Sequence, residues 1–255
     1  MKFRIDQNRY SILIFIAILC TFSVVNAQDT KPIIKPKPTT APKPVVVKPQ
    51  PKPITTQTDN KYSTVTDIDG NVYKTVKIGN QIWMAENLKT TRYNDGTPIP
   101  NVTDNNEWSN LTKGAYCYYD NDYSNNAIYG KLYNWYAVNT DKLAPKGWHV
   151  PSYKEWQQLI NYLGGESIAG GKMKSTSYWE SPNKGATNSS GFSGLPAGGR
   201  SSDGTFFYIG YNGYFWSSTE GQGNSWLFYL NFNYSYLYTY TQTKGSGLSV
   251  RCVKN

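Results

Sequence analysis

The sequence predicts a folded domain of antiparallel strands and two main helices over residues 61–255. Three observations predict it. Residues 152–163 carry a complete helix signal. Apolar and polar residues alternate at both ends of the domain. Residues 173–220, between the helix and the C-terminal strands, show little periodicity. A stretch of this length can bury a sizeable core as one domain.

The first 27 residues have the features of a secretory signal peptide. Basic residues precede an apolar run over residues 12–25, and Ala27 supplies the small residue that a signal peptidase requires. The run is shorter than the roughly 20 residues that span a membrane. We therefore expect an exported protein that is secreted, periplasmic or attached to the cell surface. Lipidation of Cys20 is an open alternative, although Leu19 is bulkier than such sites prefer.

Residues 28–60 form a linker in which lysine alternates with proline. Proline fixes φ and has no N–H, so neither a helix nor a sheet can form there. An extended polyproline II spacer, at about 3.1 Å per residue, has a reach on the order of 100 Å.

The net charge of +9 is concentrated in this N-terminal part, because residues 1–60 hold 9 of the 26 basic side chains and only three acids. The remaining residues carry 17 basic and 14 acidic side chains. This distribution, together with export, argues against nucleic acid as a partner. The linker lysines either contact an anionic envelope polymer, an attraction that salt would weaken, or simply keep the linker soluble.

An antiparallel meander is predicted at the start of the domain. Residues 64–68 and 72–76 flank the dipeptide Asp69-Gly70, which tolerates the positive φ of a hairpin turn. A second turn at residues 79–80 precedes residues 81–84 (Gln-Ile-Trp-Met).

Two helices follow. A short one is predicted over residues 131–138, where Leu132, Trp135 and Tyr136 share a face. The stronger one covers residues 152–163: Ser152 and Glu155 form a capping box, and apolar residues recur at the helical period. Gly164 then suits the left-handed conformation that ends a helix.

The second half of the domain is predicted to be a long ordered loop region followed by strands. Residues 173–220 are rich in Gly, Ser, Asn and aromatic residues, and such loops often carry function. Residues 226–232 and 234–243 alternate, and a turn at residues 244–247 leads into a last strand over residues 248–253.

Cys117 and Cys252 remain after signal removal. In an exported chain an even number of cysteines suggests a disulfide. A bridge closing so long a loop would stabilise the fold by about 4 to 5 kcal/mol in the chain-entropy model. A pair of free thiols is the alternative.

Several motifs in one order carry a family resemblance that covers nearly all of residues 62–254. They are residues 67–71 (Asp-Ile-Asp-Gly-Asn), 81–88 (Gln-Ile-Trp-Met-Ala-Glu-Asn-Leu), 129–135 (Tyr-Gly-Lys-Leu-Tyr-Asn-Trp), 147–151 (Gly-Trp-His-Val-Pro), 191–200 (Gly-Phe-Ser-Gly-Leu-Pro-Ala-Gly-Gly-Arg), 215–220 (Phe-Trp-Ser-Ser-Thr-Glu) and 249–253 (Ser-Val-Arg-Cys-Val). Together they resemble the Fibrobacter succinogenes major paralogous domain family, whose members look like secreted proteins of Bacteroidota and Fibrobacterota.

The family looks distantly related to C-type-lectin-like domains and to formylglycine-generating enzymes. In the latter, a Leu-Pro-Thr-x-x-Glu-Trp helix start is similar to residues 150–156, and a terminal Gly-Phe-Arg-Cys is similar to residues 249–252. The resemblance implies an α+β, C-type-lectin-like fold with antiparallel sheets, two main helices and a long loop region. It also implies a structural disulfide at Cys252.

The inventory of reactive residues argues against an enzyme and against a cofactor. Formylglycine-generating enzymes use a pair of copper-binding cysteines, but residues 226–247 contain none. His149 is the only histidine, which leaves no zinc cluster and no spare base, and we expect it to pack structurally. Glycosidases need only two carboxylates, yet no spacing singles out a pair.

No metal site is predicted either. Residues 67–71 begin like a calcium loop, but the twelfth position is Ile78, which cannot supply the bidentate carboxylate. A hairpin turn explains these residues better. Residues 120–122 (Asp-Asn-Asp) could hold an ion, with a solvated turn as the default.

Aromatic surface is what remains for function. We predict ligand-binding residues in or beside the loop region, because rings stack on sugar faces while polar neighbours satisfy hydroxyls. They are Tyr178, Trp179, Arg200, Tyr208, Tyr211 and Tyr214. Trp216 and Trp226 are expected to pack in the core below.

The sequence therefore predicts a secreted or envelope-associated, non-catalytic binding or adhesion module that recognises a polysaccharide or cell-wall glycan. A structural or protein-interaction module of the envelope is the first alternative. A cryptic enzyme related to formylglycine-generating enzymes is the second.

Overall fold

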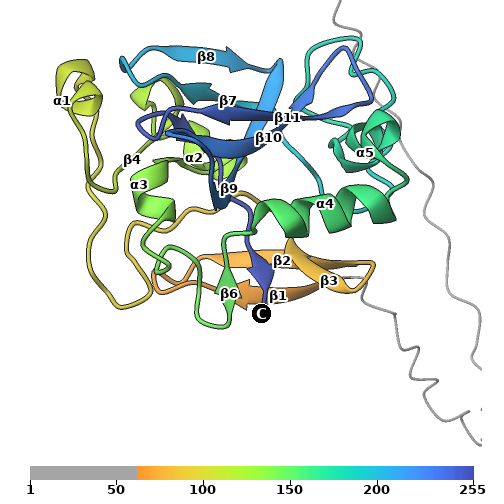
Figure 1. Cartoon of the computed structure of the whole chain (residues 1–255), viewed down its shortest axis with the longest axis horizontal. Helices are drawn as coiled ribbons and strands as arrows, with labels where there is room; N and C mark the ends of the chain where they lie inside the picture. Colours follow the sequence, from red (N-terminus) through yellow and green to blue (C-terminus); the bar gives the residue numbers. More distant parts are fainter. Residues whose placement is uncertain (1–61) are drawn as a thin grey trace, which may run out of the picture. The chain divides into compact units, whose positions relative to one another are not determined.

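The computed structural model describes residues 62–255, which form a mixed domain of two mostly antiparallel sheets and a few short helices (Figure 1). The predicted signal peptide (1–27), the Lys/Pro linker (28–60) and Cys20 lie outside the described residues. No helix within residues 62–255 is long and apolar enough to cross a membrane.

The smaller sheet, at the bottom of Figure 1, has five strands in the order β1-β2-β3-β13-β6. These strands are β1 (Tyr62–Thr66), β2 (Val72–Ile78), β3 (Gln81–Met84), β6 (Trp148–His149) and β13 (Val253–Lys254). The predicted meander is confirmed by β1, β2 and β3, which are joined by turns in which Gly70 has φ 84° and Gly79 has φ 62°. The last strand pairs with β3, so the two ends of the domain lie in one sheet.

The β1–β2 turn is held by the carboxylates of Asp67 and Asp69. Asp67 accepts hydrogen bonds from the backbone N–H groups of Asp69 and Asn71 and from the hydroxyl of Tyr73. Asp69 in turn accepts from Thr91, through its backbone N–H and its hydroxyl. The calcium-like start of this segment is therefore a hairpin turn, as the sequence predicts.

Asp69 should make folding sensitive to acid. Burial acts to raise its pKa, but hydrogen bonds from Thr91, Arg92 and Thr90 outweigh burial and lower the pKa to about 2. A lowered pKa in the folded state contributes stability above the unfolded value, about 3.9, and this stability is lost as pH falls through the folded value. We expect Asp69→Asn to reduce the change in urea midpoint between about pH 5 and about pH 2. An unchanged pH dependence would contradict this role.

The larger sheet has the strand order β11-β10-β9-β7-β12-β5-β4, and β8 pairs with β7. All its pairs are antiparallel except β7 with β9. The strands are β4 (Tyr116–Cys117), β5 (Leu132–Asn134), β7 (Ala197–Arg200), β8 (Phe206–Ile209), β9 (Asn212–Glu220), β10 (Ser225–Asn231), β11 (Leu237–Gln242) and β12 (Gly247–Leu248).

Short helical segments connect the strands in the first half of the domain. They are α1 (Asn105–Ser109), the 3-10 turn η1 (Tyr119–Asn121), α2 (Asn125–Tyr129) and α3 (Trp135–Val138). The helix predicted over residues 131–138 is half wrong, because residues 132–134 form β5 and pair with β4 and β12. Asn134 ends this strand and caps α3, accepting from the backbone N–H of Ala137.

The helix predicted over residues 152–163 is confirmed as α4 (Tyr153–Tyr162) with Ser152 as its N-cap. Both halves of the capping box are formed: Ser152 accepts from the N–H of Glu155, and Glu155 accepts from the N–H of Ser152. Gly164 follows the helix with φ 100°. The buried side of α4 presents Trp156, which stacks on Phe228 of β10 at 4.9 Å between ring centroids.

Helix α5 (Glu166–Met173) follows α4 and forms where the sequence shows no helical signal. It contains Gly170 and Gly171, which favour other conformations. A Cβ atom on Gly170 would lie 2.1 Å from the carbonyl oxygen of Tyr236. Close packing against the start of β11 therefore needs glycine here, and that packing outweighs the weak local propensity.

The predicted loop region over residues 173–220 is partly wrong, because β7, β8 and β9 lie within it. Only residues 174–196 connect helix to sheet without a strand of their own. Strand β7 was not predicted because it contains Gly198 and Gly199, and glycine is uncommon in strands. A Cβ on Gly199 would lie 2.6 Å from the ring of Phe207, so this strand is built from glycine to let β8 approach.

The predicted disulfide is also wrong, because Cys117 and Cys252 are both free and buried. Cys117 packs with Val102 and Trp108, whereas Cys252 packs in a different cluster that contains Tyr73. Burial raises the pKa of Cys117 to about 12 and raises that of Cys252 as well. Each thiol serves as a small apolar side chain of the core.

Candidate functional site: an aromatic groove on the larger sheet

Strands β9, β10 and β11 present two chemically different faces. On the face toward α4, the side chains are Phe215, Phe228, Leu230 and Leu237, and all four are buried in one cluster. Side chains alternate between faces along a strand. The opposite face therefore takes the intervening residues, which are rich in tyrosine.

The tyrosines of this opposite face form a row across the strands. Tyr229 is the direct cross-strand neighbour of Tyr214 on one side and of Tyr238 on the other. The ring centroids of Tyr214 and Tyr229 are 5.5 Å apart, and those of Tyr229 and Tyr238 are 4.8 Å apart and stacked. Tyr229 and Tyr238 cover each other's ring faces, whereas Tyr214 is tilted by 33° to Tyr229.

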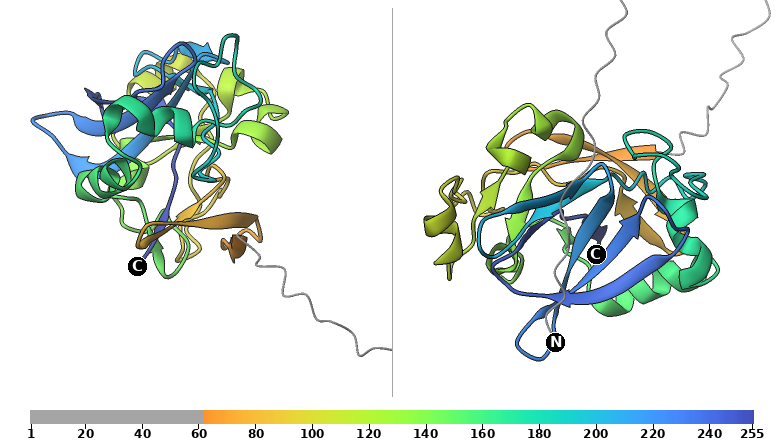
Figure 2. Two further views of the ribbon diagram at one scale, coloured as in Figure 1. Left: turned by 90° about the vertical axis from the view of Figure 1, so that its right-hand side faces the viewer. Right: turned by 90° about the horizontal axis from the view of Figure 1, so that it is seen from above.

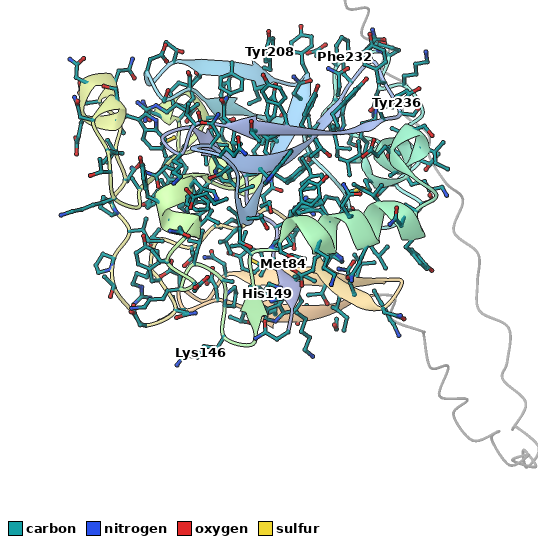
Figure 3. The ribbon with its side chains drawn as sticks, in the orientation of Figure 1. Met84, Lys146, His149, Tyr208, Phe232 and Tyr236 are labelled. Atoms are coloured by element: carbon teal, nitrogen blue, oxygen red, sulfur yellow. The ribbon has the colours of Figure 1, made fainter. Side chains whose placement is uncertain are left out.

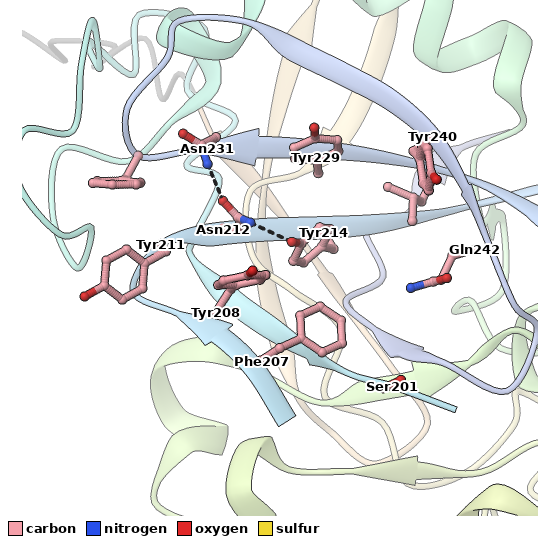
Figure 4. A pocket seen from close by; sticks show the side chains of 12 residues that line it. Ser201, Phe207, Tyr208, Tyr211, Asn212, Tyr214, Tyr229, Asn231, Tyr240 and Gln242 are labelled. Carbon is pink, nitrogen blue, oxygen red and sulfur yellow. Dashed lines mark hydrogen bonds between the residues drawn. The ribbon is translucent and has the colours of Figure 1, made fainter. Parts of the chain in front are cut away.

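A groove of about 660 Å³ lies over Tyr214 and Tyr229 of this row (Figure 4). Twelve residues line it, five of them tyrosines, and none carries a charge. They are Ser201, Phe207, Tyr208, Tyr211, Asn212, Tyr214, Leu227, Tyr229, Asn231, Phe232, Tyr240 and Gln242. The groove thus combines aromatic rings with amide and hydroxyl groups, as a site for a neutral, hydroxyl-rich ligand would.

A chain of amide hydrogen bonds orients the floor of the groove (Figure 4). Asn231 donates from Nδ2 to Oδ1 of Asn212, and Asn212 donates from Nδ2 to the hydroxyl oxygen of Tyr214, each at 2.6 Å. Because the Tyr214 oxygen already accepts, its proton is free to be donated to a ligand. Burial raises the pKa of Tyr214 to about 12, so the hydroxyl keeps that proton at neutral pH.

The rim of the groove is the turn between β8 and β9. Tyr208, near the end of β8, has φ 59°, an unusual backbone conformation for a bulky residue, and the residue is 59% exposed. The turn is held from outside, since the N–H of Glu180 donates to the carbonyl oxygen of Gly210 and Gly210 donates to that of Pro196. Strain of this kind persists where surrounding contacts determine the backbone, and it gathers at ligand sites.

Three of the predicted ligand-binding residues come together in this groove: Tyr208, Tyr211 and Tyr214. Tyr178 is 55% exposed but packs beside Tyr129 and does not line it. Trp179 is half-buried against the core and donates from its indole nitrogen to the carbonyl oxygen of Gly194. The sequence therefore located one wall of the groove and, counting Arg200, three residues outside it.

Arg200 is not a ligand-binding residue, because its side chain is fully buried. Its guanidinium donates to the carbonyl oxygens of Val102, Thr103 and Gly204. The group also lies 4.4 Å from the ring centroid of Trp108. With a fourth hydrogen bond to the side-chain oxygen of Asn105, four of its five N–H groups are used inside the fold, where they fix the segment before and at the start of α1.

Sequence reasoning missed the residues contributed by the β10–β11 hairpin, including Phe232 just after β10: Leu227, Tyr229, Asn231, Phe232, Tyr240 and Gln242. The available signal was the chemistry of the alternation. In β11, Tyr238 and Tyr240 alternate with threonines, and in β10, Tyr229 stands between Phe228 and Leu230. Of the two tryptophans expected in the core, Trp216 is fully buried, whereas Trp226 is half-buried against Tyr153.

His149 lies at the other end of the molecule from the groove residues Tyr208 and Phe232 (Figure 3). Its Nε2 is 2.7 Å from a carboxylate oxygen of Glu155, and its Nδ1 is 2.7 Å from Oδ1 of Asn255. Both ring nitrogens are thus engaged in joining β6 to the start of α4 and to the last residue. Within residues 62–255, no three His, Cys, Asp or Glu side chains gather where they could hold a metal ion.

Searches of curated proteins and of solved structures found no match to this chain. The model of the Fibrobacter succinogenes major domain matches residues 76–254, which include the β8–β9 turn, the tyrosine row and every strand from β3 onward. The chain therefore belongs to the Fibrobacter succinogenes major domain family.

Proposed function

We propose that the groove binds a neutral polysaccharide of the cell wall or envelope and that the protein is an exported, non-catalytic binding or adhesion module. The uncharged lining of five tyrosines and three side-chain amides carries this proposal. Sugar rings bury their C–H faces on aromatic rings, and their hydroxyls exchange hydrogen bonds with amides and phenols.

The groove divides these two tasks between its residues. Tyr208, Tyr211 and Tyr240 are the most exposed rings of the lining and are suited to stack on sugar faces. Tyr214 and the asparagines beneath it supply directed hydrogen bonds. A strongly anionic polymer would find no countercharge among the lining residues.

Affinity electrophoresis tests the proposal. The chain from residue 28 onward would be run through gels containing neutral polysaccharides or anionic ones, with and without a calcium chelator. Retardation by at least one neutral polymer, unchanged by the chelator, is the expected result. Retardation by anionic polymers alone, abolished by salt, would instead assign binding to the lysines of the linker.

No retardation by any polymer would favour the alternative, a structural or protein-interaction module of the envelope. Tyrosine is also enriched at protein interfaces, so the same surface suits that role.

A single hydroxyl should matter for affinity. We expect Tyr214→Phe to weaken binding about tenfold, since one directed hydrogen bond contributes about 1 to 1.5 kcal/mol. The measurement is isothermal titration with whichever neutral polymer retards the protein. Tyr129→Phe is the matched control, because Tyr129 is also a half-buried tyrosine but lies outside the groove. Equal affinities of both variants and the wild type would remove Tyr214 from the site.

The relation to C-type-lectin-like domains is part of the same proposal. The capped start of α4 and the segment around Arg251 and Cys252 support it. A cryptic oxidase would need free cysteines, and both are free, but they lie in separate clusters with raised pKa values. Stoichiometric copper binding by the purified protein would overturn the non-catalytic assignment.

A further inference from the structure

Strand β11 ends the larger sheet, and its outer edge is open. The strand pairs with β10 on one side only. Within residues 62–255, no hydrogen bond joins the backbone of Leu237–Gln242 to any group beyond that pairing. Seen from above in Figure 2, the β10–β11 hairpin runs along the outside of the domain.

This edge lacks the features that normally protect an edge strand. Leu237–Gln242 contains no charge and no proline, and it alternates tyrosine with threonine, which both favour strands. The pairing of β10 with β11 is continuous, and the nearest register shift lies between β9 and β10, away from the open side. The edge strands β4 and β6 are, in contrast, only two residues long. An unprotected edge of this kind is a template for another strand.

Helix α5 limits the part of the edge that is open. Helix α5 packs beside the start of the strand, where Gly170 approaches the carbonyl oxygen of Tyr236. Farther along, Tyr240 is 65% exposed. The available segment is therefore the second half of β11, centred near Tyr240.

We propose that this segment pairs antiparallel with the same segment of a second copy of the chain, about a two-fold axis normal to the sheet. The strand is complementary to itself: it is neutral, so two copies do not repel each other, and its alternation is preserved on reversal. A two-fold axis matches each exposed N–H of one copy with a carbonyl of the other. A charged partner strand would find no counterion on β11.

The dimer would place both grooves on one side of a continuous sheet. Directly opposite residues in antiparallel strands point to the same face, so Tyr238 and Tyr240 of one copy meet the equivalent face of the other. The tyrosine row of each groove would then continue toward its partner. Two such sites side by side suit a repetitive polymer, because the second binding event becomes intramolecular.

Light scattering after size-exclusion chromatography tests the dimer without any ligand. The chain from residue 28 onward is expected to have twice the monomer mass, and Tyr240→Lys is expected to have the mass of one chain, because like charges would meet at the axis. Tyr162→Lys is the matched control. Tyr162 is 66% exposed but lies on α4, and its variant should remain dimeric.

Disulfide cross-linking tests the same dimer without relying on Tyr240→Lys. Cys117 and Cys252 are buried, so a new surface cysteine is the reactive one. Tyr240→Cys is expected to form a covalent dimer on mild oxidation, whereas Tyr162→Cys is not. A monomeric wild-type protein at all concentrations would overturn the proposal. So would a dimer that survives Tyr240→Lys and fails to cross-link through Tyr240→Cys.

Discussion

Replacing Tyr208 and Tyr211 together by alanine is expected to weaken binding of a neutral polysaccharide about a hundredfold. Each ring at the rim should contribute about 1.4 kcal/mol of stacking and apolar burial, and that free energy corresponds to a factor of ten. Tyr208 is 59% exposed and Tyr211 is 42% exposed, so neither supports the core and the fold should be unaffected. Titration calorimetry measures the affinity, and circular dichroism verifies the fold.

The control for this pair is the replacement of Tyr123 and Tyr162 by alanine. Both are at least as exposed as the rim tyrosines, but neither lines the groove. Their loss should leave affinity unchanged. If the two double variants lose affinity equally, binding depends on tyrosine content rather than on the groove. Since Tyr208 lies near the end of β8 and Tyr211 on the turn after it, and neither lies on β11, the result does not depend on dimerisation.

Arg251→Met is expected to lower the free energy of unfolding by about 3 to 5 kcal/mol. The Arg251 side chain is fully buried and donates to the side-chain oxygen of Asn87 and to the carbonyl oxygens of Met84, Phe192 and Ser193. Methionine fills a similar volume but leaves these acceptors unpaired away from water. With a typical total stability of about 5 to 15 kcal/mol, this loss is severe.

Urea unfolding followed by tryptophan fluorescence measures this effect. Arg251→Lys should lie between the wild type and Arg251→Met, because an ammonium group retains up to three donors. Arg92→Met is the control, since Arg92 is largely exposed and its ion pair with Asp69 contributes at most about 1 kcal/mol. A loss for Arg251→Met no larger than that of the control would show that the buried guanidinium does not hold the segments together.

Arg200 and Arg251 show why the burial of a charged side chain is hard to predict from sequence. Both belong to segments used to identify the family, and an exposed arginine beside tyrosines is a reasonable sugar ligand. Both are fully buried and bind backbone carbonyls of segments far away in the sequence. Burial of a charge depends on the segments that surround it, and adjacent residues do not report them.

The residues that line the groove were also only partly predictable from sequence. The sequence predicted that aromatic residues after α4 form the site, and Tyr208, Tyr211 and Tyr214 do line the groove. The remaining wall depends on strand register: Tyr229 faces the groove because it is paired with Tyr214 and Tyr238. Register between strands is set by long-range pairing, so the tyrosine row exists only in the folded sheet.

By itself, the sequence determined the features that depend on neighbouring residues: the capped helix α4, the hairpin turn at Gly70, the strands at both ends and the family. These follow from short-range hydrogen bonds and side-chain periodicity. The tertiary structure alone decided that α5 forms despite Gly170 and Gly171, that Cys117 and Cys252 stay apart, and that β9, β10 and β11 turn their tyrosines to one side. Each of these depends on which distant segments pack together, because close packing and strand pairing outweigh local preference.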